Sequence, residues 1–310
     1  MTGKNISSYK EFILLGFSDL PNLQGFLFGI ILVIYICILL GNGLIIVIIN
    51  MDRALQTPMY FFLGNFSFVE ICYTSVTLPR MLRNLWSQKR QITLLSCAVQ
   101  LCFFLNLAVA ESFLLSVMAY DRYMAICKPL YYPLIMNHKM CVRMVIGSWV
   151  TGIPIIIGQT YQVFSVPFCG SNILNHVFCD MPPIMKLACG DTSGIEFFIF
   201  FDCFLFAFIP FLLILYSYIR ILSTILKLSS ITGRSKAFST CSSHLIVVCL
   251  YYGSGVIAYM QSMYNYSGRT DKIFSLFYLI VTPMVNPMIY SLRNKDFTEA
   301  MRKLFSKYVR

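Results

Sequence analysis

Seven long apolar segments, separated by polar connections, dominate this sequence. Each has roughly the 20 residues that a helix needs to cross the hydrocarbon core of a bilayer. Because lipid offers no hydrogen-bonding partners, each segment is expected to satisfy its backbone groups within an α-helix. The sequence therefore predicts an all-α membrane protein, a seven-transmembrane helix bundle embedded in a lipid bilayer. The expected spans are Gln24–Asn50, Pro58–Leu82, Leu94–Cys127, Met140–Gly158, Ile195–Leu222, Ala237–Met263 and Lys272–Leu292.

The composition excludes the common classes of soluble protein. Hydrophobic residues make up 58% of the 310 residues and charged residues only 12%, whereas soluble domains carry about 25% charged residues. So little charge cannot cover a soluble fold of this size, and the net charge of +11 is therefore not taken as a sign of nucleic-acid binding. The sequence shows no metal-ligand spacing and no nucleophile–base pair, so we expect neither an enzyme nor a bound cofactor.

The charge distribution predicts which way the helices cross. Lys and Arg are more frequent in the connections that face the cytoplasm if the N-terminus lies outside, as the positive-inside rule requires. Asn5 begins an Asn-x-Ser glycosylation sequon, which agrees with an external N-terminus. We expect a single domain over residues 1–310, with an extracellular N-terminus (1–23), a helix bundle (24–292) and a short amphipathic helix in the cytoplasmic tail (293–310).

Five short motifs occur at fixed places on the predicted helices. They are Gly41-Asn42 in the first span, Pro58–Leu63 at the start of the second, Met118–Cys127 at the inner end of the third, Lys236–Leu245 at the start of the sixth and Pro283–Tyr290 in the seventh. In this order and on these helices they resemble the olfactory receptors, a branch of the rhodopsin-like (class A) G-protein-coupled receptors. The serine-rich start of the sixth span resembles the terrestrial-vertebrate class (class II).

The resemblance implies a function. Such a receptor binds a small, mainly hydrophobic volatile molecule between the outer halves of helices 3, 5, 6 and 7. It then activates a stimulatory heterotrimeric G protein and raises cAMP at the plasma membrane, with olfactory cilia as the expected location. Two alternatives stay open: the same fold as a metabolite receptor in another tissue, and a proton- or ion-coupled transporter. A transporter is disfavoured because the sequence has no repeated halves.

A charged pair stands at the inner end of the third span. A guanidinium at the membrane edge needs a partner or water, and Asp121 is adjacent to Arg122. We interpret the pair as a switch that activation releases, although an arginine that merely extends to the interface would have the same signature. Pro210 predicts either a bulge that moves the fifth helix or an ordinary kink. The resemblance implies these residues for activation and G-protein coupling: Asp121, Arg122, Tyr123, Tyr218, His244, Tyr252, Asn286, Pro287 and Tyr290.

Two acidic residues, Glu70 and Glu111, lie within predicted spans, where ionisable side chains are costly and mark function. Pro287 interrupts the backbone hydrogen bonds of its helix, so Asn286 and the freed carbonyls need polar neighbours. The resemblance implies a hydrated polar pocket formed by Asn42, Glu70, Glu111 and Asn286, with Na⁺ as a candidate ligand. The alternative is that the carboxyls are protonated and only hydrogen-bond between helices. Glu70 stands where the family more often has Asp, which leaves the ion geometry open.

Four cysteines are predicted to lie outside, where an oxidising environment favours disulfides. Four thiols allow three connectivities, and the sequence alone does not choose among them. The resemblance implies the pairs Cys97–Cys179 and Cys169–Cys189. These bridges would hold the long connection over residues 159–194 as a lid across the mouth of the bundle.

A ligand in a helix bundle is expected between the helices, among mostly apolar side chains. Tyr259 is the expected polar contact. Asp202 is unusual because it stands in an aromatic-rich segment, and its cost in lipid predicts that it faces the bundle. There it either bonds to the ligand or braces neighbouring helices. The resemblance implies this ligand-binding set: Leu101, Phe104, Leu105, Ala108, Val109, Phe198, Asp202, Cys203, Phe206, Gly255, Val256, Tyr259, Leu276 and Leu279.

Overall fold

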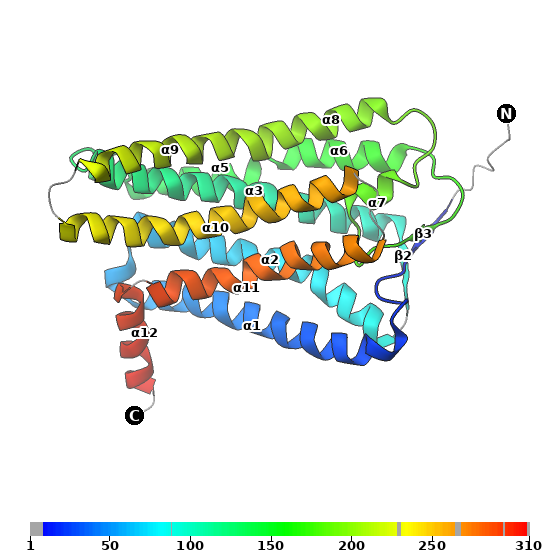
Figure 1. Cartoon of the computed structure of the whole chain (residues 1–310), viewed down its shortest axis with the longest axis horizontal. Helices are drawn as coiled ribbons and strands as arrows, with labels where there is room; N and C mark the ends of the chain where they lie inside the picture. Colours follow the sequence, from blue (N-terminus) through cyan, green and yellow to red (C-terminus); the bar gives the residue numbers. More distant parts are fainter. Residues whose placement is uncertain (1–8, 88, 228–230, 264–267, 294, 309–310) are drawn as a thin grey trace.

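The computed structural model describes residues 9–87, 89–227, 231–263, 268–293 and 295–308. Its long helices lie side by side along one axis and form a bundle (Figure 1). The fourth membrane helix is divided into two parts, and the fifth contains a π-helical turn between its two parts. In chain order the long elements are α1 (Gln24–Met51), α2 (Pro58–Ser87), α3 (Leu94–Cys127), α5 (His138–Val150) with α6 (Ile153–Ser165), α8 (Ser193–Cys203) with the π-helical turn η3 (Phe204–Phe208) and α9 (Ile209–Leu226), α10 (Ile231–Met263) and α11 (Gly268–Arg293).

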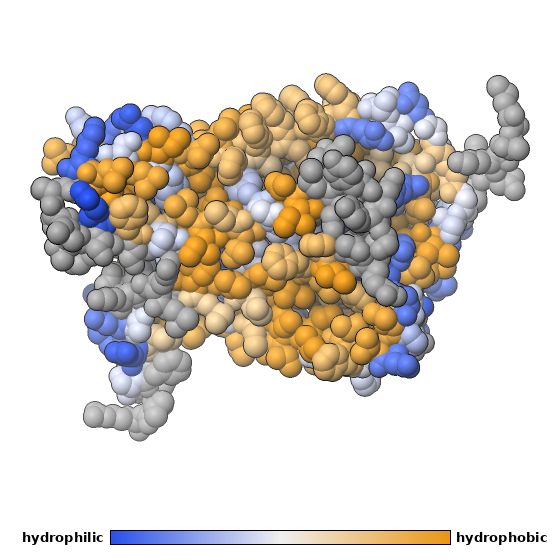
Figure 2. All heavy atoms as spheres, in the orientation of Figure 1, coloured by the Kyte–Doolittle hydropathy of each residue, from blue (hydrophilic) through white to orange (hydrophobic). Residues whose placement is uncertain are grey.

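The surface of the bundle suits a membrane. Among the described residues, six helical stretches are long and apolar enough to cross a bilayer, and α10 contains a shorter apolar stretch, Cys241–Ile257. Figure 2 shows hydrophobic side chains in a band across the middle of the visible face and hydrophilic side chains gathered at the two ends. On α1 the residues Phe26, Val33 and Leu40, two turns apart, are 65%, 60% and 68% exposed. The predicted all-α membrane fold is therefore confirmed.

The fourth helix departs from the predicted span in length and continuity. It runs from His138 to Ser165 and is interrupted after Val150. Gly152 lies at the interruption, and a Cβ atom there would lie 2.9 Å from Val109 Cγ1 on α3. Only a glycine permits this approach of the fourth helix to α3, because valine is branched at Cβ and has little freedom to move away.

A small sheet, which the sequence analysis did not predict, covers one end of the bundle. Strand β1 (Glu11–Leu14) pairs antiparallel with β2 (Gln91–Thr93) and parallel with β3 (Ile173–Leu174). Alternate side chains of β1 point inward, and Phe12 and Leu14 are fully buried. The segment before the first helix thus becomes part of the packed structure. We call this end of the bundle the sheet end.

The opposite end carries Arg122, the short helix α4 (Tyr132–Ile135) and the C-terminal helix α12 (Lys295–Tyr308), and we call it the Arg122 end. Helix α12 turns across the axis of the bundle (Figure 1). Its Phe297 and Ala300 are buried while Arg302 and Lys303 are exposed, so the predicted amphipathic tail helix is present. The remaining short helices are η1 (Pro21–Leu23), η2 (Arg53–Leu55) and α7 (Met181–Met185).

Candidate functional site

The charged pair at the Arg122 end is formed. Arg122 donates from Nε to Asp121 Oδ2 over 3.0 Å, and a second guanidinium nitrogen contacts the same oxygen. Tyr132 on α4 donates its hydroxyl to the other oxygen, Oδ1, over 2.8 Å. The Asp121 side chain is fully buried, where an unpaired charge would be costly. Its two oxygens accept hydrogen bonds from Arg122 and Tyr132, and Arg122 compensates its charge. This is the closed arrangement of the predicted switch.

A second contact at this end links α9 to α10. Tyr218 and His244 share a hydrogen bond of 2.8 Å between Oη and Nδ1, and their rings stack with centroids 5.7 Å apart. His244 also lies within the electrostatic influence of Arg122. The two predicted switch groups therefore face the same region of the bundle. Tyr123 instead lies with its ring near Tyr216 of α9.

Polar side chains meet at the centre of the bundle. Asn286 donates to Glu70, Glu70 and Glu111 interact through their carboxyl groups, and Asn42 donates to the carbonyl of Pro283 over 3.2 Å. Each of these four polar residues is at most 2% exposed. The structure thus brings together the complete predicted polar pocket from α1, α2, α3 and α11.

Four buried oxygens of this cluster have no hydrogen-bond partner among the described residues: Asn42 Oδ1, Glu70 Oε2, Glu111 Oε1 and Asn286 Oδ1. Buried polar atoms without partners are costly, so the cluster has spare capacity for a cation, a proton or water. Gly41 lies next to Asn42 in the sequence, and a Cβ atom at Gly41 would lie 3.3 Å from Pro287. The absence of a side chain at Gly41 therefore lets α1 pack close to α11. Neither this cluster nor any other place in the described part of the chain brings together three His, Cys, Asp or Glu side chains that could hold a metal ion.

The fifth helix contains the bulge that Pro210 predicted. Residues Phe204–Phe208 form a π-helical turn directly before α9. Ser116 on α3 donates to the Pro210 carbonyl over 3.0 Å, and one turn earlier Ser112 shares a hydrogen bond of 2.8 Å with Tyr252 of α10. Helices α3, α9 and α10 are therefore joined at mid-depth, between the two ends of the bundle.

At the sheet end the long connection (residues 166–192) closes over the bundle. The structure contains both disulfides that the resemblance implied, with Cα–Cα distances of 5.5 Å for Cys97–Cys179 and 5.7 Å for Cys169–Cys189. Asp180 accepts a hydrogen bond of 2.8 Å from Tyr278 of α11. The connection is thus fixed to α3 by a covalent bond and to α11 by a hydrogen bond.

Two further residues of the long connection reach into the bundle. His176 is 2.8 Å from the Ser275 hydroxyl of α11. Phe178 packs on Phe104 of α3 with ring centroids 5.0 Å apart and is 1% exposed. The connection therefore packs directly on Phe104 and closes this end of the bundle.

The predicted ligand-binding residues do not form one enclosed set. The buried members are Leu101, Phe104, Val109, Asp202, Phe206 and Leu279, and the half-buried ones are Leu105, Ala108 and Leu276. In contrast, Phe198 is 49% and Val256 is 60% exposed, and Cys203 and Gly255 are also exposed. At these four positions α8 and α10 face the surroundings of the bundle, and their contact with a ligand stays a prediction.

Even the α3 members face different partners. Leu101 packs with the disulfide Cys97–Cys179 in the cluster under the sheet, whereas Val109 packs with Ile156 and Phe206. These five positions follow the i, i+3, i+4, i+7, i+8 spacing of one helix face, which at about 100° per residue is roughly 140° wide, so its two edges pack against different neighbours. The side chains of Tyr259 and Tyr290, and Asn5 altogether, lie outside the described residues.

Asp202 is buried and unpartnered. Its residue is 8% exposed, and it makes no hydrogen bond to any described residue. This burial agrees with the prediction that it faces the bundle, and no hydrogen bond joins it to another described helix.

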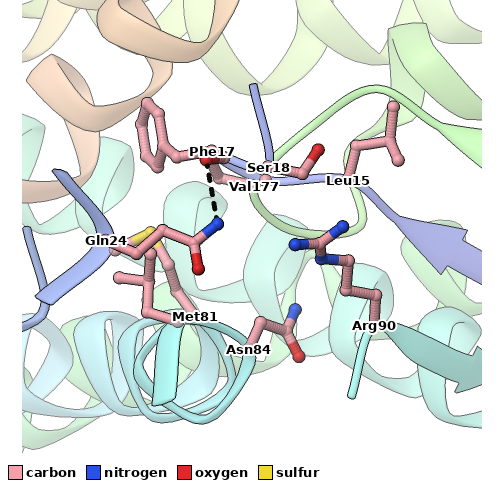
Figure 3. Close-up of a pocket in the computed structure, with 10 residues that line it drawn as sticks. Leu15, Phe17, Ser18, Gln24, Met81, Asn84, Arg90 and Val177 are labelled. Atoms are coloured by element: carbon pink, nitrogen blue, oxygen red, sulfur yellow. Dashed lines mark hydrogen bonds between the residues drawn. The ribbon is translucent and has the colours of Figure 1, made fainter. Parts of the chain in front are cut away.

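The described cavities lie outside this region. One, between the N-terminal segment and α2, has a volume of about 10 Å³, which is scarcely enough for one water molecule. Figure 3 shows Met81 and Asn84 there beside Gln24, which donates to the Phe17 carbonyl over 3.4 Å. A cavity of this size cannot hold an organic ligand.

Sequence reasoning missed Tyr132, His176 and Phe178. Each acts through a contact with a residue on a different element, and Tyr132 stands in a connection without any motif of its own. No signal within one segment could have identified these contacts.

Comparison with known proteins gives a consistent result. The model of a family described as "Olfactory receptor" matches residues 31–308. The chain is 57% identical to human olfactory receptor 10AG1 over 297 residues, covering 96% of this chain and 99% of that protein. It is 48% identical to human olfactory receptor 10A7 over 309 residues, covering 100% and 98%. Squid rhodopsin has the same fold, with a TM-score of 0.73 at 19% identity, covering 92% of this chain and 87% of that chain.

Proposed function

This chain belongs to the olfactory receptor family, and from that premise we propose that it is an odorant receptor that activates a stimulatory heterotrimeric G protein and raises cAMP. As a family member it is a G-protein-coupled receptor and a multi-pass membrane protein rather than an enzyme. The proposed ligand is a small, mainly hydrophobic volatile molecule.

The sheet end is proposed to face outward, at the plasma membrane of olfactory cilia. Both disulfides lie at this end, and disulfides persist in oxidising compartments. The N-terminal segment enters the structure here, which agrees with an external, glycosylated Asn5. The Arg122 end then faces the cytoplasm and its G protein.

The observation that carries the proposal is the closed switch at the Arg122 end. Arg122 is held by Asp121 beside the Tyr218–His244 contact, where α3, α9 and α10 converge. Ligand binding would favour a second arrangement, in which Arg122 is released, by binding that state more tightly. Next to the switch, Leu130 and Leu134 are 87% and 72% exposed, an apolar surface suited to a protein partner.

The ligand is proposed to lie beneath Phe178, between the outer halves of helices 3, 5, 6 and 7. Phe104 and Leu279 supply buried apolar surface there, and Asp202 supplies an unpartnered polar group. A ligand hydroxyl or amine would satisfy Asp202, whereas dispersion would hold the rest of the molecule.

Na⁺ is proposed as the occupant of the central polar cluster. The four unpartnered oxygens of Asn42, Glu70, Glu111 and Asn286 are the kind of donors that hard cations prefer. A cation would also offset the repulsion between the two carboxyl groups. These residues would hold the ion, and its release would let α11 move relative to α2 and α3.

Substitution of Arg122 tests the coupling. Cells expressing the chain are screened with volatiles grouped by functional group and with non-volatile metabolites, using a cAMP reporter. At equal surface amounts, Arg122→Ala should abolish the response, while Arg143→Ala, which changes an exposed arginine at the same end, should keep it. Undiminished signalling by Arg122→Ala would contradict the proposed switch, and a response only to metabolites would favour the metabolite receptor.

A further inference from the structure

An open groove of about 450 Å³ lies between α2, β2 and α3 near the sheet end. Its apolar wall is a stripe on α3, where Leu95, Val99 and Phe103 are 75%, 47% and 59% exposed. These residues are four positions apart, so they form one line along the helix about 12 Å long. The opposite wall consists of Val76 and Arg80 on α2.

The stripe lies at membrane depth. Phe103 is the tenth residue of α3, which places it about 14 Å from the sheet end of that helix. Arg80 lies seven residues before the end of α2, about 10 Å from the same end. Trp86 on the last turn of α2 is 77% exposed, as is typical of an aromatic residue at the membrane interface. The groove thus runs from the headgroup region toward the hydrocarbon core.

Arg80 is the cationic group of this groove. One of its Nη atoms donates to the Gln91 carbonyl, its Nε is buried without a hydrogen-bond partner among the described residues, and its other Nη donors make no hydrogen bond to a described residue. Gln100, which forms part of the groove floor, already makes two hydrogen bonds within the protein: it donates to the Val76 carbonyl and accepts from the Cys179 amide. Among the residues that line the groove, Arg80 alone carries a positive charge, so its Nη donors are the candidate contact for an anion.

The residues near Arg80 in the sequence are basic. Arg83, Lys89 and Arg90 follow Arg80 in the sequence, and no Asp or Glu occurs between Glu70 and Glu111. The adjoining strand carries Glu11 opposite Thr93, but among the described residues the side-chain hydrogen bond of Arg80 goes to the Gln91 carbonyl and not to a carboxylate. A cation near the membrane interface without an acidic partner is suited to a phosphate group.

We propose that this groove binds a phospholipid of the surrounding leaflet, with its phosphate on Arg80 and one acyl chain along Leu95, Val99 and Phe103. The volume suits one chain and part of the headgroup, and the site is separate from the proposed odorant site. The lipid would hold β2 and α2 together beside the sheet. The statement that this leaflet is the outer one rests on the proposed orientation of the receptor; the lipid site itself does not.

Photo-crosslinking of the full-length receptor in cells tests this proposal. Cells take up a phosphatidylcholine analogue with a diazirine in its acyl chain, and peptide mass spectrometry maps adducts on receptor recovered from the cell surface. The measured quantity is the ratio of adducts on residues 94–103 to adducts on a lipid-exposed stripe of α9, Leu212, Tyr216 and Ile219. Parallel samples receive a diacylglycerol or a free fatty-acid analogue with the same diazirine.

We expect the ratio to exceed one with the phosphatidylcholine analogue and to fall strongly in Val99→Trp, which fills the groove. Arg80→Gln should lower it by about tenfold, the scale for loss of a charge-assisted hydrogen bond. The matched controls, Arg83→Gln and Leu213→Trp on α9, should leave it unchanged. A ratio unaffected by Val99→Trp, equal ratios for Arg80→Gln and Arg83→Gln, or equal labelling by a phosphate-free analogue would each overturn the proposal. None of these readouts depends on odorant signalling.

Discussion

The hydroxyl of Tyr132 donates a hydrogen bond of 2.8 Å to Asp121 Oδ1, on the side of the carboxylate opposite Arg122. The pKa of the Tyr132 phenol is raised well above its usual value, first by burial and then by the charge of Asp121. The hydroxyl therefore remains protonated at physiological pH and acts as a donor. A residue on a separate short helix thus helps to hold the switch closed.

Tyr132→Phe should raise ligand-independent signalling, because it removes one of the bonds that hold Asp121 against Arg122. Loss of about 0.5–1.5 kcal/mol from the closed state corresponds to roughly a two- to tenfold shift in the equilibrium. Basal cAMP at equal surface amount is the measurement. Tyr131→Phe, a neighbouring residue that is 59% exposed, is the matched control. Equal basal cAMP in the two variants would argue against a role for the Tyr132–Asp121 bond.

Gly152→Ala should reduce folding and surface delivery. The added methyl group would lie 2.9 Å from Val109 Cγ1, so either α3 or the fourth helix must move. Overpacking of this kind costs about 1–3 kcal/mol. Gly147→Ala, where nothing lies within 4 Å of the new atom, should behave like the unmodified chain. Flow cytometry of an N-terminal tag compares them, and similar surface amounts would show that the contact tolerates a methyl group.

Cys97→Ser and Cys179→Ser should each prevent surface delivery, and the double variant should be no worse than either one. The reason is that both substitutions remove the same bond, so their effects are not additive. This bond fixes Phe178 over Phe104. Partial losses that add together would instead indicate two independent roles.

Asp202 should influence which odorants act. If it contacts the ligand, Asp202→Asn should weaken basic ligands most, because the charge is lost while the size is kept. Asp202→Leu should favour purely apolar ligands, since an unmatched buried polar group costs about 1–3 kcal/mol. Responses to an alcohol, an aldehyde, an amine and an alkane-like odorant are compared at equal surface density. An unchanged rank order across the four would leave Asp202 a purely structural role.

The central polar cluster shows how far sequence reasoning reached into the site. The cost of polar groups in a membrane marked Glu70 and Glu111 and predicted polar neighbours for Asn286, whereas the pocket of these three with Asn42 was what the family resemblance implied. The ligand set was less predictable. Phe198 and Val256 are exposed although the family pattern implied a pocket position, since the rotation of a helix against its neighbours is set by packing that no local motif encodes.

The sequence by itself determined that this chain crosses a membrane as helices, where those helices lie, and that Pro210 disturbs the fifth one. These properties follow from hydropathy, length and backbone chemistry within single segments. The tertiary structure alone decided that Phe12 and Leu14 enter a sheet, that Phe178 covers Phe104, and that Tyr132 holds Asp121. Such contacts join residues far apart in the chain, so they depend on the relative placement of packed elements, which hydropathy and local propensity do not specify.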